Sequence, residues 1–375
     1  MRFLPAVLLC LSAAALAEAP PVPPAPQFEA TAWILVDQDS GRVLAGHATG
    51  ERLEPASITK LMTAYATFHA LREGRLKLDT PVPISEKAWR AEGSDTFLDV
   101  GARVPAEVLI QGMIVQSGND ASIALAESIA GTEETFAALM NQYGVRLGLK
   151  GSHFENATGL PGTGHRMTVA DIATLTRAII REFPDYYRWY SQREFTWNNI
   201  RQPNRNRLLL RDPSVDGVKT GMTDAAGYCL VSSARREGMR LVAVVMGMKS
   251  MQAREDASLA LLNYGFSFFE TRKLKAAGEE AAVQRIYRAR GGRAAVGVPQ
   301  DLWVTLPRGM AARATFAVEL APKLFAPLSP SDRTGTLRAL VDGKVVAEAP
   351  LSPLAEVPRG NIFRRIWDTI LSWFA

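Results

Sequence analysis

The chain has 375 residues, of which 47% are hydrophobic and 22% charged, and its formal net charge is +5. This length suits about two domains, with cores large enough to be stable without disulfide bonds. The basic excess is mild and includes no run of Lys and Arg typical of a nucleic-acid-binding arm, so we expect no nucleic-acid partner. The four histidines are scattered without the spacing of metal ligands, and we predict neither a metal nor another cofactor.

Residues 1–17 are predicted to be an export signal. Arg2 precedes an apolar run, and Ala15-Leu16-Ala17 has the small–x–small pattern of a cleavage site. The run is too short to span a bilayer comfortably. Lipid attachment at Cys10 is a disfavoured alternative, because a bulky leucine precedes that cysteine. Residues 18–27 form a Pro-rich leader, which we expect to be extended and mobile.

The next stretch, residues 28–271, is predicted to be an α/β domain of the α+β type. Its expected elements, in chain order, are strands over 32–36 and 42–45, a helix from residue 55, mostly helical chain over 105–149, a helix over 168–183, a loop region to residue 211, strands over 227–233 and 240–246, and a helix over 251–269. Because strands stand before and after the helical block, we expect an antiparallel sheet that is covered by helices.

Residues 272–352 differ in composition and are predicted to form a small all-β, sandwich-like domain. Short runs typical of β-strands, separated by Gly, Pro or charged turns, occur at 283–287, 294–298, 302–306, 314–320, 335–341 and 345–349. We see no group of catalytic side chains there. We therefore interpret this domain as a stalk or spacer.

The last segment, residues 353–375, is predicted to be a linker followed by an amphipathic helix over 361–375. The polar face of the helix carries Arg364, Arg365, Asp368 and Ser372, and the apolar face carries Ile362, Phe363, Ile366, Trp367, Ile370, Trp373 and Phe374. The segment is too short and too charged to span a bilayer, but it suits a helix that lies in the headgroup region of an anionic membrane. The alternative is that the helix docks on its own domain. We favour the membrane because Pro353 and Pro358-Arg-Gly360 form a linker that isolates the helix.

The first of three short polar motifs is Ser57-Ile-Thr-Lys60. A serine hydroxyl is a poor nucleophile until a base removes its proton. The two side chains lie one helical turn apart on the same face, so a neutral Lys60 amine can reach Ser57 Oγ. Burial and a second cation both lower the pKa of a lysine, and Lys219 is a candidate for that cation. The motif is common by chance, but its apolar neighbours indicate that it faces inward.

Two further motifs supply the remaining polar groups. Ser117-Gly-Asn119 interrupts an apolar stretch; Ser117 could relay a proton, Asn119 could hold a substrate amide, and the glycine would allow a sharp bend. Lys219-Thr220-Gly221 lies at the end of a predicted strand. Lys219 and Thr220 could bind an anionic carboxylate, and Gly221 would let a substrate backbone approach. Either motif alone could be an ordinary polar turn or strand end, but all three in this order, in an exported chain, predict acyl transfer by a serine nucleophile.

With these motifs the chain resembles the low-molecular-mass penicillin-binding proteins, which are serine D-alanyl-D-alanine carboxypeptidases of the peptidase S11 kind. Further stretches share the likeness, which covers almost the whole chain: Gly159-Leu-Pro161 with His165 and Thr168, Asn204-Arg-Asn206, and Gly247-Met-Lys249 with Arg254. The resemblance implies that 28–271 is the catalytic domain. It also implies a location on the periplasmic face of the bacterial inner membrane, peptidoglycan stem pentapeptides as substrates, and β-lactams as covalent inhibitors.

The resemblance also implies the roles of the site residues. Ser57 would be the acylated nucleophile and Lys60 its general base. The oxyanion hole would be formed by the backbone N–H groups of Ser57 and of Met222 or Thr223. Met222 stands where a histidine is often found, a departure that bears on substrate contacts and deacylation rather than on acylation. The implied catalytic set is Ser57, Lys60, Ser117 and Asn119, and the implied substrate-binding set is Lys219, Thr220, Gly221, Arg205 and Arg254.

Three alternatives involve the same site. A β-lactamase needs a dedicated base for fast deacylation, and no Glu-x-x-Leu-Asn element lies between Ser117 and Lys219, since Glu155-Asn156 is followed by Ala-Thr-Gly. A transpeptidase or endopeptidase would use the same residues with another acceptor or donor, and the sequence leaves that alternative open. A non-catalytic wall-binding scaffold is disfavoured because all the core polar residues are present.

Overall fold

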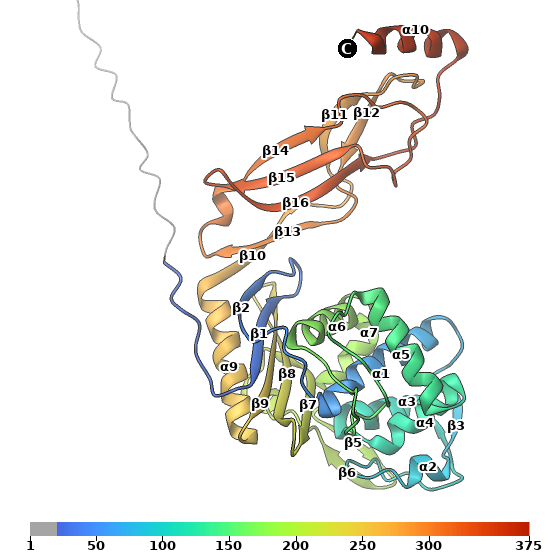
Figure 1. Ribbon diagram of the computed structural model, residues 1–375, viewed down its shortest axis with the longest axis vertical. Coiled ribbons are helices and arrows are strands. Elements are labelled where there is room, and N and C mark those ends of the chain that lie inside the picture. The colour runs from blue at the N-terminus through green and yellow to red at the C-terminus, as the bar shows by residue number, and fades with distance from the viewer. Residues whose placement is uncertain (1–20, 375) are drawn as a thin grey trace, which may run out of the picture.

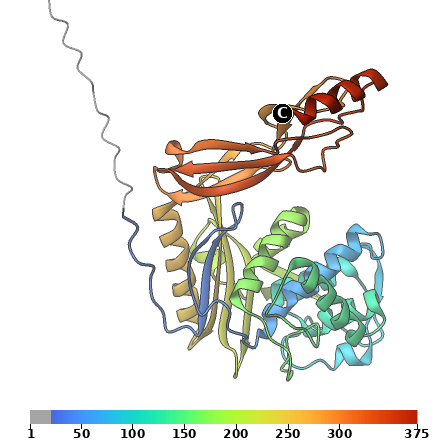
Figure 2. The same ribbon diagram turned by 45° about the horizontal axis from the view of Figure 1, so that its top comes forward.

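The structure is a computed structural model that describes residues 21–374 (Figure 1). The predicted export signal at 1–17, Cys10 within it, and the first part of the predicted leader lie outside the described residues. The described chain forms a unit of helices and sheet, an elongated β unit stacked on one end of it, and a terminal helix at the far end of the β unit (Figures 1 and 2). Nowhere in residues 21–374 is there a helix with the length and apolar character needed to cross a membrane.

A five-stranded antiparallel sheet organises the first unit and confirms the predicted fold class. Its strands, in spatial order, are β2 (Val43–His47), β1 (Ala32–Asp37), β9 (Met239–Met248), β8 (Gly227–Arg236) and β7 (Val215–Thr223). Successive side chains of a strand point to opposite faces. In β1, Trp33 and Leu35 join the core on one face of the sheet. Ile34 and Val36 join the larger core on the other face.

Helices cover both faces of this sheet (Figure 1). Helix α9 (Met251–Phe268) covers one face, and a helical lobe covers the other. The elements of the lobe are the 3-10 turn η1 (Ala56–Thr59), α1 (Lys60–Arg72), β3 (Pro81–Pro83), α2 (Glu86–Trp89), β4 (Arg103–Pro105), α3 (Ala106–Gln111), the π-helical turn η2 (Gly112–Gln116), α4 (Asn119–Ala130), α5 (Glu133–Leu147) and α6 (Val169–Glu182). Helix α6 begins where the sequence predicted it, because the Thr168 hydroxyl caps it by accepting from Asp171 N–H at 3.1 Å.

The chain over 184–211, predicted to be a loop region, contains short elements instead. They are α7 (Pro184–Tyr187), the 3-10 turn η3 (Arg188–Ser191), the hairpin of β5 (Glu194–Trp197) and β6 (Ile200–Pro203), and α8 (Leu208–Arg211). Each has four residues, which is too few to produce a recognisable hydrophobic period. The prediction of a plain loop was therefore wrong.

The described part of the leader differs from the prediction as well. Val22, Ala25 and Phe28 pack against the core beneath α9. Tyr264 Oη, on α9, donates a hydrogen bond to Pro23 O at 3.0 Å. The leader is extended as predicted, but it lies along the domain rather than free of it, because its apolar side chains pack against the core that includes α9. The sequence alone did not predict this packing.

The second unit is built from strands alone, apart from the 3-10 turn η4 (Ala311–Arg313). Strand β10 (Phe269–Lys275) continues directly from α9 and pairs with β13 (Leu302–Pro307). A five-stranded sheet follows, in the order β11 (Glu280–Arg285), β12 (Arg293–Gly297), β16 (Lys344–Pro353), β15 (Gly335–Val341) and β14 (Thr315–Leu320). Each of the six predicted strand runs overlaps one of these strands. Strand β10 was not predicted, because it continues directly from α9 and the predicted helix over 251–269 included its first residue.

Helix α10 (Ile362–Trp373) lies against the β unit (Figure 2). Asp368 and Ser372, on its polar face, are buried. Asp368 is 1% exposed and accepts a hydrogen bond from Arg288 N–H at 2.7 Å. Lys323 Nζ donates to Ser372 O at 2.8 Å. The opposite face is exposed and consists of Ile362, Phe363, Ile366, Trp367, Ile370, Trp373 and Phe374. The helix thus docks on its own domain and still leaves its apolar face uncovered by residues 21–374.

The linker before α10 is tied to the β unit rather than isolated from it. Arg290 N–H donates to Pro358 O at 3.1 Å, and Gly360 N–H donates to Arg288 O at 2.7 Å. We predicted that the two prolines would isolate the helix from its domain, and these hydrogen bonds show that they do not. Backbone hydrogen bonds of this kind leave no mark in side-chain composition.

Candidate active site

The Ser57 hydroxyl and the Lys60 amine lie side by side where η1 passes into α1. Lys60 Nζ is 3.0 Å from Ser57 Oγ, within hydrogen-bond distance. Lys60 is 1% exposed, whereas Ser57 is half-buried and lines a cavity. The hydroxyl that faces the cavity therefore has an amine directly behind it.

Two carbonyl oxygens fix the orientation of that amine. Lys60 Nζ donates to Asn119 Oδ1 at 2.6 Å and to Thr158 O at 2.7 Å. A neutral amine has two N–H bonds and one lone pair, so donation to both oxygens directs the lone pair toward Ser57. Burial lowers the pKa of Lys60 to about 7, and the nearby Arg205 adds to the shift. A large share of the amine is therefore in the base form at neutral pH.

The cation that lowers the pKa of Lys60 is Arg205 rather than the predicted Lys219. Lys219 is itself fully buried, and burial, followed by Lys60 and two arginines, lowers its own pKa well below the usual value. Arginine keeps its charge under conditions in which a buried lysine loses it. The sequence pattern did not distinguish these two cations, because their relative burial depends on the fold.

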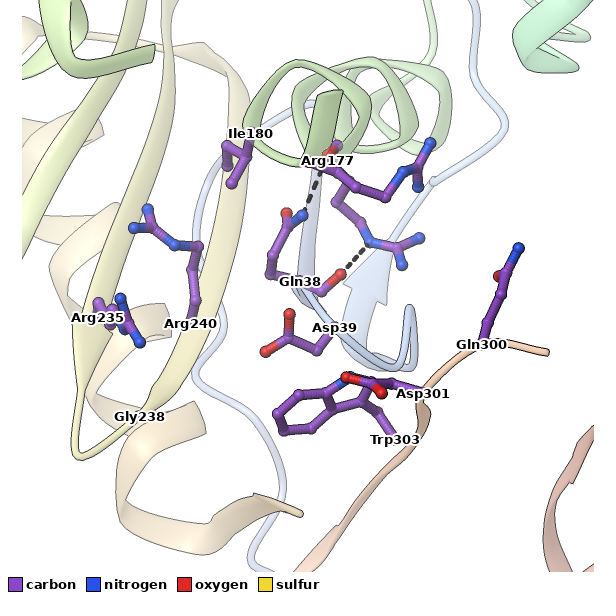
Figure 3. A pocket seen from close by; sticks show the side chains of 11 residues that line it. Gln38, Asp39, Arg177, Ile180, Arg235, Gly238, Arg240, Gln300, Asp301 and Trp303 are labelled. Carbon is purple, nitrogen blue, oxygen red and sulfur yellow. Dashed lines mark hydrogen bonds between the residues drawn. The ribbon is translucent and has the colours of Figure 1, made fainter. Parts of the chain in front are cut away.

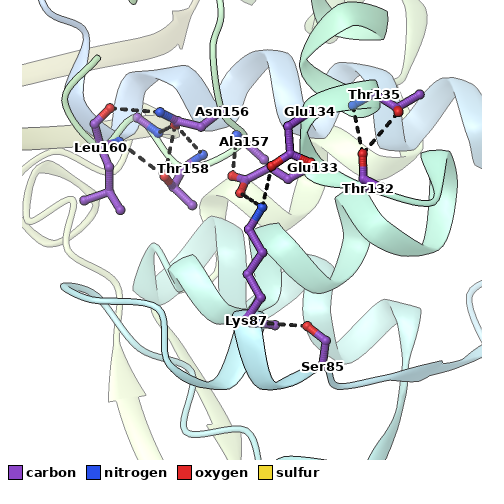
Figure 4. A network of polar contacts seen from close by, with 12 residues as sticks. Ser85, Lys87, Thr132, Glu133, Glu134, Thr135, Asn156, Ala157, Thr158 and Leu160 are labelled. Atoms are coloured by element: carbon purple, nitrogen blue, oxygen red, sulfur yellow. Dashed lines mark hydrogen bonds and ion pairs between the residues drawn. The ribbon is translucent and has the colours of Figure 1, made fainter.

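Thr158 lies in a loop, and a network of polar contacts to that loop holds the Thr158 carbonyl in place (Figure 4). Asn156 Oδ1 accepts two backbone N–H groups of the loop, at 2.7 and 3.1 Å. Ala157 N–H donates to Glu133 Oε1 at 3.0 Å, and Lys87 Nζ pairs with Glu133 at 3.0 Å. This network reaches Lys60 through a backbone atom, so no side-chain motif signalled it.

Ser117 and Asn119 stand at the junction between η2 and α4. The left-handed residue of the bend is Ser117 itself, with φ of 70°, and not Gly118 as predicted. Gly118 is needed for another reason: a Cβ there would lie 1.9 Å from Thr96 Oγ1. Ser117 Oγ is buried and has no hydrogen-bond partner among the described residues. Asn119 Nδ2 donates to Glu92 O at 2.6 Å, which leaves its Oδ1 for Lys60.

Strand β7 carries Lys219, Thr220 and Gly221 along the edge of the sheet beside η1. Lys219 and Thr220 are buried, and Lys219 Nζ donates to Thr220 O at 3.1 Å. A Cβ on Gly221 would lie 3.1 Å from Pro55 O, tighter than almost all real contacts. Gly221 thus lets the strand approach the turn that bears Ser57. The sequence analysis predicted only that Gly221 would let a substrate backbone approach, and not this contact within the protein.

The two arginines of the implied set come from different elements. Arg254, on α9, is 3% exposed and donates to Gly221 O and Cys229 O, each at 3.1 Å. Arg205 is exposed, and its Nε donates to Gln116 O at 2.9 Å. Arg254 is therefore fixed against the backbone of the sheet, and Arg205 stands above the junction that carries Ser117.

The cavity in front of these residues has a volume of about 710 Å³. Of the sequence-predicted residues it exposes Ser57, Ser117, Asn119, Thr220, Gly221, Arg205 and Arg254. Lys60 and Lys219 are buried behind its wall. Leu160, from the family-like stretch Gly159-Leu-Pro161, adds apolar surface to the rim, together with Leu210, Met251 and Tyr228, which the sequence did not single out. Among residues 21–374, no group of three or more His, Cys, Asp and Glu side chains could hold a metal ion.

His165, part of the family-like stretches, supports the site from behind. Its Nε2 lies 2.8 Å from Thr59 Oγ1, on the turn that bears the nucleophile. Burial lowers the pKa of His165 to about 4, so the ring is neutral near pH 7. His165 is 1% exposed and does not line the cavity, and its contact with η1 is structural.

The sequence and the fold of this chain are similar to those of known proteins. Residues 17–250 match the family model described as D-alanyl-D-alanine carboxypeptidase, and residues 269–359 match that of the penicillin-binding protein 5 C-terminal domain. The D-alanyl-D-alanine carboxypeptidase DacA of Escherichia coli (strain K12) is 41% identical over 94% of this chain and 90% of its own length. A crystal structure of penicillin binding protein 5 from Haemophilus influenzae superposes with a TM-score of 0.85 at 38% identity, covering 90% of this chain and 99% of that one. Penicillin-binding protein D2 from Listeria monocytogenes in an ampicillin-bound form has a TM-score of 0.60 at 26% identity, covering 65% of this chain and 100% of that one.

Proposed function

The chain belongs to the D-alanyl-D-alanine carboxypeptidase family of penicillin-binding serine peptidases, and from this premise we propose how its residues carry out the reaction. The single observation that supports the proposal most is the position of the Lys60 amine. It is buried, oriented by two carbonyl oxygens, and 3.0 Å from Ser57 Oγ. Among the described residues 21–374, no histidine lines the cavity to compete for the role of base.

The first half of the reaction acylates Ser57. The neutral Lys60 amine takes the proton of the hydroxyl while Oγ attacks the carbonyl carbon of the penultimate D-alanine of a peptidoglycan stem pentapeptide. The backbone N–H groups of Ser57 and of Met222 or Thr223 stabilise the oxyanion. The peptide bond then breaks, and the proton held by Lys60 passes to the leaving D-alanine amine through the Ser117 hydroxyl. The unpartnered Ser117 Oγ beside Ser57 in the cavity supports this relay.

The second half hydrolyses the ester. Lys60, neutral again, removes a proton from water that attacks the acyl carbon, and Ser57 Oγ leaves with that proton. Asn119 acts in both halves as a positioning residue, because its Oδ1 fixes the amine and its Nδ2 is tied to Glu92 O.

The free carboxylate of the terminal D-alanine binds at the β7 end of the cavity. Thr220 offers a hydroxyl, Arg254 is fixed next to Gly221, and Arg205 extends over the opening. Lys219 lies behind the wall and strengthens the positive field whenever it is protonated. A β-lactam has a carboxylate and a reactive acyl carbon at comparable positions, which explains how it would acylate the same serine.

Incubation of the protein with a stem pentapeptide tests the function. We expect loss of one D-alanine, and a mass increase on the peptide that contains Ser57 after treatment with penicillin. Neither should occur in Ser57→Ala, while Ser331→Ala, at an exposed serine of the β unit, should behave as wild type. Fast, sustained hydrolysis of a chromogenic cephalosporin with no D-alanine release would instead indicate a β-lactamase, and cleavage only of cross-linked dimers would indicate an endopeptidase.

We also propose that α10 holds the enzyme on an anionic membrane surface through 361–375. Its apolar face is exposed while its polar face is bonded to the β unit, so the helix is presented rather than hidden. An exposed row of this size is unfavourable in water and is typical of an interfacial helix. Together with the export signal predicted at 1–17, this supports a location at the periplasmic face of the inner membrane, with residues 272–352 as the spacer from the catalytic domain at 28–271.

Flotation with vesicles of phosphatidylethanolamine and phosphatidylglycerol tests the anchor. The mature chain should float, and the Phe363→Asp/Trp367→Asp variant should not. Val145→Asp is the matched control, because Val145 is also 80% exposed but lies on α5. If the double variant floats with the vesicles as wild type does, the anchor assignment is wrong.

A further inference from the structure

A second cavity lies at the junction of the two units, away from the active site (Figure 3). It has a volume of about 640 Å³, and its lining includes four arginines: Arg177 and Arg181 on α6, Arg235 on β8 and Arg240 on β9. The β unit contributes Gln300, Asp301 and Trp303. Each unit thus supplies one wall, and neither unit alone forms the cavity.

The four guanidinium groups differ in how far their charge is already compensated. Arg240 pairs with Asp216 at 2.6 Å, and Arg181 pairs with Glu182 at 2.7 Å. Arg177 Nε donates only to the Gln38 backbone carbonyl, at 3.0 Å. Arg235 is exposed and lines the cavity, and its side chain has no ion pair or hydrogen bond within residues 21–374.

Acidic side chains offset part of this charge. Asp39 lines the cavity; its partial burial, followed by the neighbouring Asp37, raises its pKa, while the nearby Arg240, Arg235 and Arg177 oppose that rise. Asp301 is paired with Lys273 at 2.5 Å. Arg177 and Arg235 therefore leave the cavity with an excess of positive charge, which favours an anionic ligand.

The remaining lining groups suit a sugar rather than a bare ion. The indole of Trp303 forms part of the wall, and Asp39, Asp301, Gln38 and Gln300 offer hydrogen-bond acceptors of the kind that bind hydroxyl groups (Figure 3). The Gln38 side chain is 7% exposed, its Nε2 is used by Arg177 O, and its Oε1 has no partner among the described residues. The volume is also in the range of roughly 300–1,000 Å³ of small-molecule sites, far more than one small anion needs.

An adjoining cavity of about 610 Å³ lengthens this site into a groove. The two cavities share Asp39, Asp301 and Trp303, and the second continues along Ser40, Arg42 and residues 345–348 of β16. Polar contacts hold the walls together, since Ser40 Oγ lies 2.6 Å from Thr305 Oγ1 and Arg42 donates to Thr305 O at 2.6 Å. An elongated ligand of several linked rings fits such a groove better than a single ring does.

We propose that this junction groove, lined by Arg177, Arg235 and Trp303, binds a carboxylate-bearing sugar chain. The carboxylates would pair with the two guanidinium groups, and a sugar ring would stack on the indole. This site goes beyond the proposed peptidase function, because it does not use the Ser57 cavity. It gives the enzyme a second grip on a polymer that carries both sugars and carboxylates, the class to which its substrate belongs.

The position of the groove fits a separate grip. Strand β8 begins at Gly227, near the active site, and ends at Arg236, beside Arg235 of the groove. Tyr228 of β8 lines the active-site cavity and Arg235 lines the groove, so the two linings are seven steps of about 3.3 Å apart, or about 23 Å along the strand. A chain bound in the groove therefore does not occupy the catalytic cavity.

Binding of stem-free glycan strands tests the proposal. In such strands each lactyl group ends in a free carboxylate, and the probe lacks the D-alanine that the active site recognises. Arg235→Glu should weaken binding about tenfold or more, since it replaces a charge-assisted contact by repulsion. Arg103→Glu is the matched control, because Arg103 is also exposed on a strand, has no side-chain partner within residues 21–374, and changes the net charge equally. Its affinity should stay within about twofold of wild type.

Three further measurements separate the groove from the active site and from other anions. Ser57→Ala should bind the strands as wild type does, and Arg235→Glu should keep the wild-type rate of acylation by penicillin, which also shows that it is folded. Strands whose carboxylates are converted to amides should bind at least about tenfold more weakly. Arg235→Gln is the second variant if the charge reversal impairs folding, and it should weaken binding in the same direction.

The proposal is overturned if Arg235→Glu and Arg235→Gln both bind the strands with wild-type affinity, or if amidated strands bind as tightly as the acidic ones. Displacement of the strands by an equal concentration of inorganic phosphate would also overturn it, since the groove would then be a phosphate site. Because binding of the strands is also measured in Ser57→Ala, the result for the groove does not depend on whether the peptidase assignment holds.

Discussion

Helices α1 and α10 both break the rule that polar side chains face water and apolar ones face the core. Helix α1 buries Lys60, and α10 exposes six large apolar side chains while it buries Asp368. A buried amine is unfavourable as a cation, so its pKa falls and it becomes a base. An exposed apolar row is unfavourable in water, so it favours contact with another apolar phase. In each helix we propose that the unfavourable placement marks the functional face.

The two placements also differ in how they are supported. The surroundings of Lys60 are complete within the chain, because Ser57, Asn119 and Thr158 satisfy its amine. The apolar face of α10 has no such cover within residues 21–374. We therefore infer the role of Lys60 from its contacts within the chain. We infer the role of α10 as a docking face from the lack of contacts to its apolar side within residues 21–374.

The largest expected effect comes from Lys60→Arg. Arginine keeps a positive charge in the same place but cannot act as a base near neutral pH. The rate of Ser57 acylation by penicillin, followed by mass spectrometry, should fall about 10³-fold. Lys77→Arg, an exposed lysine on the same unit, should acylate at the wild-type rate. Wild-type acylation by Lys60→Arg would show that the buried amine is not the base.

The pH dependence of wild-type acylation sharpens the same point. Since the Lys60 pKa is about 7 and the neutral form is the base, the rate should rise with pH through 7 and level off above it. Below that value it should fall about tenfold per pH unit. Stability has the matching sign: between about 7 and 10.5 the unfolded chain binds the proton that the folded chain has lost, so the free energy of unfolding rises with pH. A rate that is flat from pH 5 to pH 9 would contradict this account.

Asp368→Ala probes the supported side of α10. The substitution leaves the Arg288 N–H and Arg364 Nε, now 2.7 and 3.1 Å from the carboxylate, without their acceptor. We expect the docking of α10 to weaken by about 2 kcal/mol, seen as faster hydrogen exchange of its backbone amides. Asp79→Ala, at an exposed aspartate of the first unit, should leave that exchange unchanged. Unchanged exchange in Asp368→Ala would mean that the polar face does not hold the helix.

The smallest effect is expected from Gly221→Ala. The added Cβ would lie 3.1 Å from Pro55 O and 3.2 Å from Ile58 Cγ1, so β7 and η1 must move apart slightly. Acylation should slow several-fold and stability should fall by about 1 kcal/mol. Gly50→Ala is the control, since nothing lies within 4 Å of its Cβ position. If both variants melt and acylate alike, the close approach of strand and turn is not needed for the site.

The sequence predicted much of this site because its chemistry resides in side chains at fixed spacings. Ser57 and Lys60 are neighbours through one helical turn, so their contact needs no knowledge of the tertiary fold. The strands around the helical block were likewise visible in their composition, and they confirmed the fold class.

The parts that escaped prediction depend on tertiary contacts. The Thr158 carbonyl is a backbone atom. The left-handed residue of the bend is Ser117 rather than the adjacent glycine, and Gly118 is required instead because Thr96 occupies the space beside it. The docking of α10 through Asp368 and the packing of the leader along α9 depend on surfaces that are distant in sequence.

The most direct test of the central claim is the mass of the Ser57 peptide during turnover of a stem pentapeptide at several pH values. The account predicts a transient acyl adduct on Ser57, release of one D-alanine, and an adduct formation rate that follows the neutral fraction of an amine with a pKa of about 7. Release of D-alanine without any adduct on Ser57, or with an adduct on another residue, would contradict it.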